Sequence, residues 1–242
     1  MTQNIYDNHQ FFEGYSQLSR SVHGLDGAGE WDTIRSLLPR LEGAQIVDLG
    51  CGLGWFCRWA RQHGAVSVLG IDVSENMLTR AEAETQDEHI RYERADLESL
   101  QLAPAAYDLV YSSLAFHYIE NLMGLLKQAY DGLKPGGSLV CSVEHPIYTA
   151  SSNAGWIQHP DGHKTWPVDS YQYEGVRTTN WLAQGVVKQH RTMGTYLNML
   201  ISIGFIITHV EDWGPSEEQL AAHPEWEEER HRPMFLLITA RK

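Results

Sequence analysis

The sequence predicts a doubly wound α/β domain, and three observations support this prediction. Between residues 45 and 144, short apolar segments alternate with longer amphipathic ones, which is typical of repeated strand–helix units. A glycine-rich turn follows the first of these apolar segments. Seven segments have strand character in all, and a length of 242 residues suits one large domain.

The expected strands are short, apolar and bounded by turn residues. They cover 45–49, 65–71, 89–93, 107–112, 138–143, 205–210 and 234–240. The first two helices are expected at 54–63, closed by Gly64, and at 75–84, with Ser74 as the N-cap. Two later helices carry apolar side chains at helical spacing, namely Leu122, Leu125, Leu126 and Ala129 in one, and Met193, Tyr196, Leu197 and Leu200 in the other.

Two regions fall outside this alternation. Residues 1–40 look helical and irregular, and we interpret them as an N-terminal lid. Residues 145–190 show little regular pattern, yet they contain six aromatic and only six charged residues, which is too aromatic for a disordered loop. The expected organisation is therefore a lid (1–40), a core (41–144), a cap inserted after the fifth strand (145–190), and a last helix with two strands (191–242).

Composition limits the possible partners and the compartment. The chain has 18 Lys and Arg against 31 Asp and Glu, a net charge of −13, which argues against a nucleic-acid partner. Three cysteines without a CxxC pair indicate neither a disulfide framework nor a zinc site, and His159 with His163 lacks a third metal ligand. No signal peptide or long apolar run is evident. We expect a cytoplasmic protein, a monomer or homodimer, with no metal and no membrane association.

Three sequence features indicate a nucleotide site at the strand ends. Glycines 50, 52 and 54 form a turn that lets the backbone approach a ligand closely, after the strand that contains Asp48. Asp72 ends the second strand, where a carboxylate can accept both hydroxyls of a ribose. Asp96 follows the third strand, where it can accept from an adenine amino group. Trp55 stands where the dinucleotide fingerprint needs its third glycine, which disfavours an NAD(P) oxidoreductase.

The segments 47–54, 69–74, 95–97, 107–113 and 133–137 resemble, in order, the motifs of class I S-adenosylmethionine (SAM)-dependent methyltransferases. The resemblance is closest to bacterial small-molecule enzymes of the ubiquinone/menaquinone-biosynthesis type, although the stretch 115–119 differs from true quinone methyltransferases. It implies a Rossmann-like sheet of seven strands with the last strand antiparallel, SAM as cofactor and S-adenosylhomocysteine (SAH) as product. It also implies that Asp48 and the glycine loop face the methionine part, Asp72 the ribose, and Asp96 with Leu97 the adenine. The cofactor-binding residues predicted in this core are Asp48, Gly50, Cys51, Gly52, Gly54, Asp72, Val73, Met77, Asp96, Leu97 and Ser112.

The acceptor side carries no fixed motif, because methyl transfer depends mainly on proximity and orientation. His145 and His117 follow the fifth and fourth strands and are candidate general bases, with a strand cap and a packed helix-start residue as the structural alternatives. Tyr15 and Arg20 are expected to close over the cofactor, with Arg20 pairing its methionine carboxylate.

The aromatic, charge-poor cap favours a small, flat acceptor methylated on nitrogen or oxygen, either heteroaromatic or phenolic. An RNA- or protein-modifying methyltransferase and a non-catalytic SAM-binding regulator are the alternatives.

Overall fold

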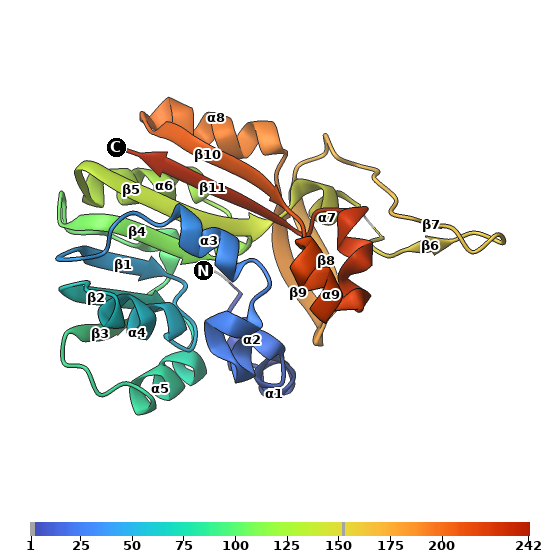
Figure 1. Cartoon of the computed structure of the whole chain (residues 1–242). Coiled ribbons are helices and arrows are strands. Elements are labelled where there is room, and N and C mark those ends of the chain that lie inside the picture. Colours follow the sequence, from blue (N-terminus) through green and yellow to red (C-terminus); the bar gives the residue numbers. More distant parts are fainter. Residues whose placement is uncertain (1–2, 152) are drawn as a thin grey trace.

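The computed structural model describes residues 3–151 and 153–242, and a seven-stranded sheet forms its centre (Figure 1). The sheet order is β3-β2-β1-β4-β5-β11-β10. Strands β1 to β5 are parallel, and β11 runs antiparallel to both β5 and β10. The strand bounds are β1 Gln45–Leu49, β2 Ser67–Asp72, β3 Ile90–Arg94, β4 Tyr107–Ser113, β5 Leu133–Glu144, β10 Ile206–Trp213 and β11 Phe235–Arg241. The predicted fold class, including the antiparallel last strand, is confirmed.

Helices cover both faces of the sheet. One core lies between the sheet and helices α3 (Trp31–Leu37), α4 (Trp55–Gln62) and α5 (Glu75–Ala83), and contains Trp31, Phe56 and Leu78. The other lies under α6 (Leu122–Gly132) and α8 (Met193–Ile203), with Leu125 and Leu200. Strand β1 pairs with both β2 and β4, so successive strands are added first on one side of β1 and then on the other. At such a topological switch point the carboxyl ends of the strands border a crevice suited to a ligand.

The N-terminal segment lies near these carboxyl ends (Figure 1). It contains η1 (Ile5–Asp7), α1 (His9–Ser16), α2 (Ser19–Val22) and η2 (Gly24–Gly27). Asp7 fixes it to the start of α5, where its carboxylate accepts hydrogen bonds from the Ser74 hydroxyl at 2.6 Å and the Asn76 amide at 3.1 Å. Side chains of this segment therefore reach the crevice.

The region 145–190 contains more regular structure than the sequence suggested. It has α7 (Pro146–Ala150), a short hairpin of β6 (Ile157–Gln158) and β7 (Lys164–Thr165), and a longer hairpin of β8 (Gly175–Trp181) and β9 (Ala183–His190). The β6–β7 hairpin projects away from the body (Figure 1). The β8–β9 hairpin packs on the N-terminal segment through a small core that includes Phe11, Val186 and Trp181. The N-terminal segment and this hairpin thus pack together as one unit.

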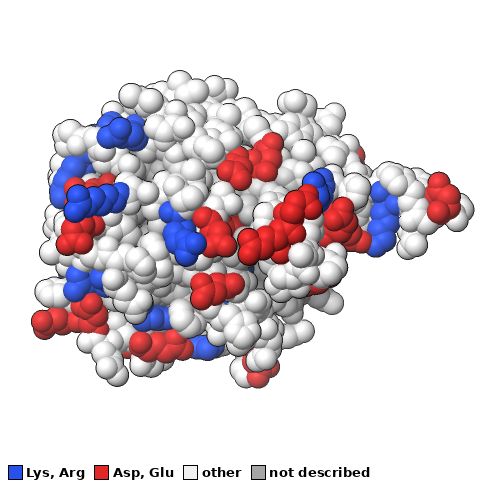
Figure 2. Space-filling model, in the orientation of Figure 1, with Lys and Arg blue, Asp and Glu red and all other residues white. Residues whose placement is uncertain are grey.

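The surface shown in Figure 2 carries a strip of acidic residues over α9 (Glu217–Ala222) and η5 (Pro224–Arg230). Lys and Arg side chains on the same face are scattered among Asp and Glu. Among the described residues, no helix is long and apolar enough to cross a membrane.

Candidate active site

The glycine loop presents bare backbone to the crevice at the end of β1. Gly50 has a φ of +83°, and a Cβ at this position would collide with the Cβ of Ala115. Gly52 has a φ of +51°, and a Cβ there would meet no described atom within 4 Å. Because Gly52 also lines the larger cavity described below, this space is open to a ligand.

Asp72 is fixed by the backbone on both sides. Its Oδ2 accepts a hydrogen bond from the Gly52 amide and its Oδ1 one from the Ser74 amide, each at 2.9 Å. Burial raises the pKa of Asp72, and these two hydrogen bonds act in the opposite direction. Each carboxylate oxygen retains a lone pair, so the predicted pair of ribose hydroxyls can be accommodated.

Asp72 lies between two cavities. The smaller has a volume of about 60 Å³, and its wall contains the predicted adenine-side residues Val73, Asp96 and Leu97 together with Ile119. Asp96 also caps the turn η3 (Leu97–Ser99), accepting from the Glu98 amide at 3.1 Å. Its place in the wall of this small, largely apolar cavity suits contact with a base.

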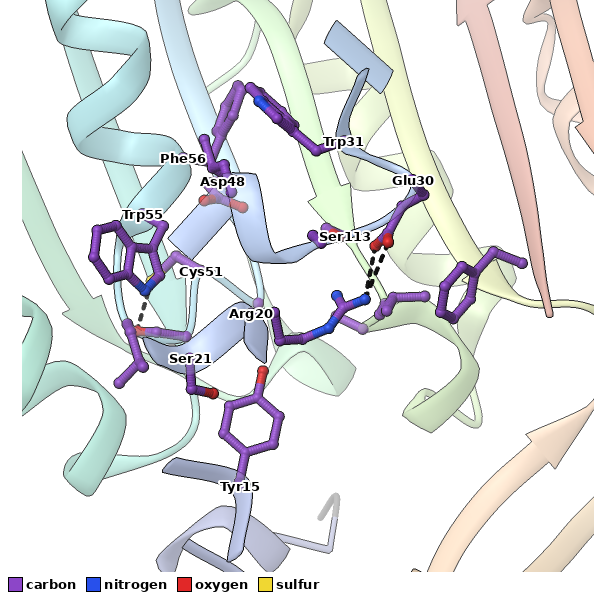
Figure 3. A pocket seen from close by; sticks show the side chains of 18 of the residues that line it. Tyr15, Arg20, Ser21, Glu30, Trp31, Asp48, Cys51, Trp55, Phe56 and Ser113 are labelled. Carbon is purple, nitrogen blue, oxygen red and sulfur yellow. Dashed lines mark hydrogen bonds and ion pairs between the residues drawn. The ribbon is translucent and has the colours of Figure 1, made fainter. Parts of the chain in front are cut away.

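The larger cavity has a volume of about 350 Å³ and begins at the glycine loop (Figure 3). Of the predicted residues, its wall contains Tyr15, Arg20, Asp48, Gly50, Cys51, Gly52, Asp72, Met77 and His117. Burial raises the pKa of Asp48 to about 8, and the Cys57 thiol donates to its Oδ2 at 3.4 Å. A buried carboxyl group beside the loop can pair with the ammonium group of a methionine moiety.

Arg20 enters this cavity from the N-terminal segment and already has a partner. Its Nη2 lies 3.0 Å from each carboxylate oxygen of Glu30, whose side chain is buried (Figure 3). A cofactor carboxylate would therefore share or replace this contact. Tyr15 lies next to Arg20, with its hydroxyl directed toward it in the same view.

The structure places three predicted residues outside both cavity walls. Gly54, with a φ of +72°, is the N-cap of α4, and a Cβ there would strike the Tyr92 hydroxyl. The Ser112 hydroxyl is buried between strands and donates to the Leu49 carbonyl at 2.7 Å. Its neighbour Ser113 lines the larger cavity instead, because successive strand residues point to opposite faces.

His145 is the third, and both of its ring nitrogens are engaged. Its Nδ1 accepts from the Ile147 amide at 3.0 Å, as the N-cap of α7, so Nε2 carries the hydrogen and donates to Asp212 at 2.8 Å. The side chain is buried and does not belong to the described wall of either cavity. This geometry makes His145 a local helix cap, whereas the structural alternative considered from the sequence was a strand cap, and it leaves no ring nitrogen free to act as a base.

His117 does line the larger cavity, but burial lowers its pKa to about 4. Its Nδ1 accepts from the Glu144 amide at 3.3 Å, so the neutral ring carries its hydrogen on Nε2. At neutral pH this ring is suited to donate a hydrogen bond and poorly suited to remove a proton.

Sequence reasoning missed several residues of this wall, including Tyr6, Glu30 and Glu144. Glu144 immediately precedes His145 and is the last residue of β5. Its place at the carboxyl end of a strand was therefore the sequence signal that could have identified it as a site residue. No group of three or more His, Cys, Asp or Glu side chains within the described ranges could hold a metal ion.

The site geometry fits a nucleoside that carries an amino-acid tail, and the comparisons agree. A family model described as a methyltransferase domain matches residues 47–141. A crystal structure of an S-adenosylmethionine-dependent methyltransferase from Mesorhizobium loti is 55% identical, with a TM-score of 0.88 over 90% of this chain and 100% of that chain.

Two curated sequences extend this comparison. A Haemophilus influenzae protein of uncharacterised function is 36% identical over 98% of this chain and 96% of its own length. A trans-aconitate 2-methyltransferase from Deinococcus radiodurans is 32% identical over 69% of this chain and 64% of its own length. The chain therefore belongs to the S-adenosylmethionine-dependent methyltransferases, with S-adenosylmethionine as its cofactor.

Proposed function

We propose that this enzyme methylates a nitrogen or oxygen atom of a small, flat metabolite, either heteroaromatic or phenolic. The observation that carries the proposal is the wall of the larger cavity beyond the glycine loop, which contains the rings of Tyr6, Tyr118, Tyr148 and Trp181. Such a wall favours a planar acceptor through stacking and edge contacts. The cover formed by the lid and the β8–β9 hairpin suits a molecule small enough to be enclosed.

The residues of the chain have distinct roles in this proposal. S-adenosylmethionine, when bound, supplies an electrophilic methyl group on a sulfonium sulfur. Asp72 and the glycine loop orient the nucleoside, while Asp48 and Arg20 hold the charged groups of the amino-acid tail. Tyr15 and Trp181, from the lid and the cap hairpin, exclude water from the larger cavity. Most of the rate enhancement then comes from proximity and orientation.

We propose that His117 orients the acceptor by donating a hydrogen bond from Nε2. Its low pKa and the contact of its Nδ1 with the Glu144 amide support this role over that of a general base. An acceptor with an available lone pair requires no strong base, which is consistent with a site whose cavity-lining histidine is a hydrogen-bond donor. The quinone-biosynthesis type of enzyme remains a prediction from the motifs alone.

An organic acid is the second candidate acceptor, because the Deinococcus relative is named for trans-aconitate. A macromolecular acceptor has less support, since the acidic strip over α9 and η5 would repel a polyanion on that face (Figure 2).

The experiment is to incubate the protein with SAM labelled in the methyl group and with separated fractions of metabolites, RNA and protein. We expect label in a small molecule that absorbs ultraviolet light, as aromatic compounds do. The Asp72→Ala variant is the control for enzyme-dependent transfer. Label found only in RNA or protein would reject the small-molecule proposal, and label found only in an aliphatic acid would reject the aromatic acceptor.

A further inference from the structure

A buried ion pair lies beside the cavity wall, apart from the residues assigned to the cofactor. Glu144 ends β5 and lines the larger cavity, and the Nζ of Lys188 in β9 is 2.6 Å from its Oε1. The side chains of Glu144 and Lys188 are 14% and 4% exposed. The Lys188 ammonium also lies over the rings of Trp181 at 5.1 Å and Tyr118 at 6.0 Å. The carboxylate is thus fixed among the aromatic side chains of the proposed acceptor site.

The second oxygen of this carboxylate is unsatisfied. Oε2 of Glu144 is closed off from solvent and has no hydrogen-bond partner among the described residues. A buried charged oxygen without a partner is unfavourable, so a ligand that donates to it gains affinity. Rotation about the last torsion of a glutamate is soft and moves both oxygens together, so a small rotation turns Oε2 toward the cavity while the long Lys188 side chain follows Oε1.

The charges of the cavity wall indicate which ligands this carboxylate would select. The wall contains four acidic side chains, those of Glu30, Asp48, Asp72 and Glu144, and one guanidinium group, that of Arg20. Because Arg20 is paired with Glu30 and is assigned to the carboxylate of the cofactor, the described part of the wall offers no free cation to a second carboxylate. A carboxylate ligand would find no free cation there and would approach the Glu144 carboxylate, whereas an N–H or O–H group would find an acceptor.

We infer that Glu144 determines acceptor specificity by accepting a hydrogen bond from an N–H or O–H group of the molecule to be methylated. Lys188 orients the Glu144 carboxylate through their ion pair. The cavity therefore takes neutral or cationic hydrogen-bond donors and rejects organic acids. This inference rests on the proposed function, whose acceptor class it narrows.

The test uses three probes that share one ring: benzyl alcohol, benzylamine and benzoate. Each is titrated by NMR into the protein saturated with SAH, and its dissociation constant is measured. We expect both donor probes to bind about tenfold or more tightly than benzoate, which is the range for a hydrogen bond to a charged group. In Glu144→Gln the difference should fall to about threefold or less, because the charge is lost while the shape is kept.

Glu229→Gln is the matched control. Glu229 is a partly buried carboxylate paired with Arg232 at 3.1 Å and lies outside the described cavity walls, so this variant should keep the wild-type preference. The inference would be overturned by any of three results. These are benzoate binding as tightly as the donor probes, undetectable binding of both donor probes, and an unchanged preference in Glu144→Gln. The wild-type result does not depend on the folding of any variant. The labelled-methyl experiment tests the proposed function separately, because methyl transfer to an aromatic acid would support the proposed function and reject only the role of Glu144.

Discussion

Asp48 should lower the free energy of unfolding of the ligand-free protein near neutral pH, and replacing it with a side chain that cannot ionise should remove this effect. Burial raises its pKa from 3.8 to about 8, so the folded protein binds a proton that the unfolded chain releases. The free energy of unfolding therefore falls as pH rises between these two values and levels off above pH 8. At about 1.4 kcal/mol per pH unit, the loss relative to a neutral side chain is about 2 kcal/mol at pH 5 and about 4 kcal/mol at pH 7.

The Asp48→Asn substitution removes this ionisation while keeping the shape of the side chain and an oxygen for the Cys57 thiol. The new amide group lacks a defined partner, which costs about 1–3 kcal/mol at every pH. The informative quantity is therefore how the difference in free energy of unfolding between the variant and wild type changes with pH. Relative to wild type, the stability of the variant should increase by about 2–3 kcal/mol between pH 5 and pH 7.

The assay is urea unfolding of the ligand-free proteins at pH 5, 6, 7 and 8, since bound cofactor would add its own stabilisation. Asp32→Asn, at an exposed position of α3, is the control, and it should change stability by about 0.5 kcal/mol or less at each pH. A stability difference between Asp48→Asn and wild type that stays constant from pH 5 to pH 8 would refute the argument. Such a result would mean that Asp48 is ionised in the empty cavity.

Three further predictions concern the cofactor and its cover. Asp72→Ala should weaken SAH binding by about 30- to 150-fold, because it removes a bidentate, charge-assisted contact, and calorimetry giving an affinity within about twofold of wild type would contradict the assignment. Hydrogen exchange should slow in residues 9–22 and 175–190 when SAH binds, since these segments pack together over the larger cavity; unchanged exchange in both at saturation would argue against a closing cover. His145→Ala should lower the free energy of unfolding by about 1–3 kcal/mol through loss of the α7 cap and the Asp212 contact, with SAH affinity kept within about twofold. A tenfold loss of SAH affinity in this variant would show that His145 acts on the site.

The core of the fold follows from local sequence patterns. The first strand was predicted at 45–49 and is found there, because a buried parallel strand is a short apolar run followed by glycine. The β8–β9 hairpin was not predicted. Residues along β8 alternate between partly buried and exposed and include Thr178, Thr179 and Asn180, so the segment lacks an aliphatic run. Its apolar contacts come from distant residues such as Phe11, which local periodicity does not reveal.

The cofactor side of the site was easier to predict than the acceptor side for a related reason. Asp72 and Asp96 each follow one strand, and parallel strands end at a common edge of the sheet. The proposed acceptor side combines Tyr6 from the N-terminal segment, Glu144 from the end of β5 and Trp181 from the β8–β9 hairpin. These residues meet only once the N-terminal segment and the hairpin pack together, so their spacing along the chain carries no information about the site.

Which residues at the strand ends line the larger cavity could nevertheless have been predicted from the two-residue period of a strand. The larger cavity lies on the face of the sheet that packs against α3 and α4, where Ile46, Leu109 and Val140 are buried. Asp48 has the same parity as Ile46, and Ser113 the same parity as Leu109, and both line this cavity.

On β5, Glu144 shares the parity of Val140 and lines the cavity, and it pairs in register with Phe235, which lines it as well. Ser112 and His145 have the opposite parity, and the structure places both away from the cavity walls. Choosing His145 by its titration range ignored this parity. Once one residue of a strand is known to face a cavity, the period of the strand identifies its neighbours on that face, and here it selects Glu144 as the carboxylate at the proposed acceptor site.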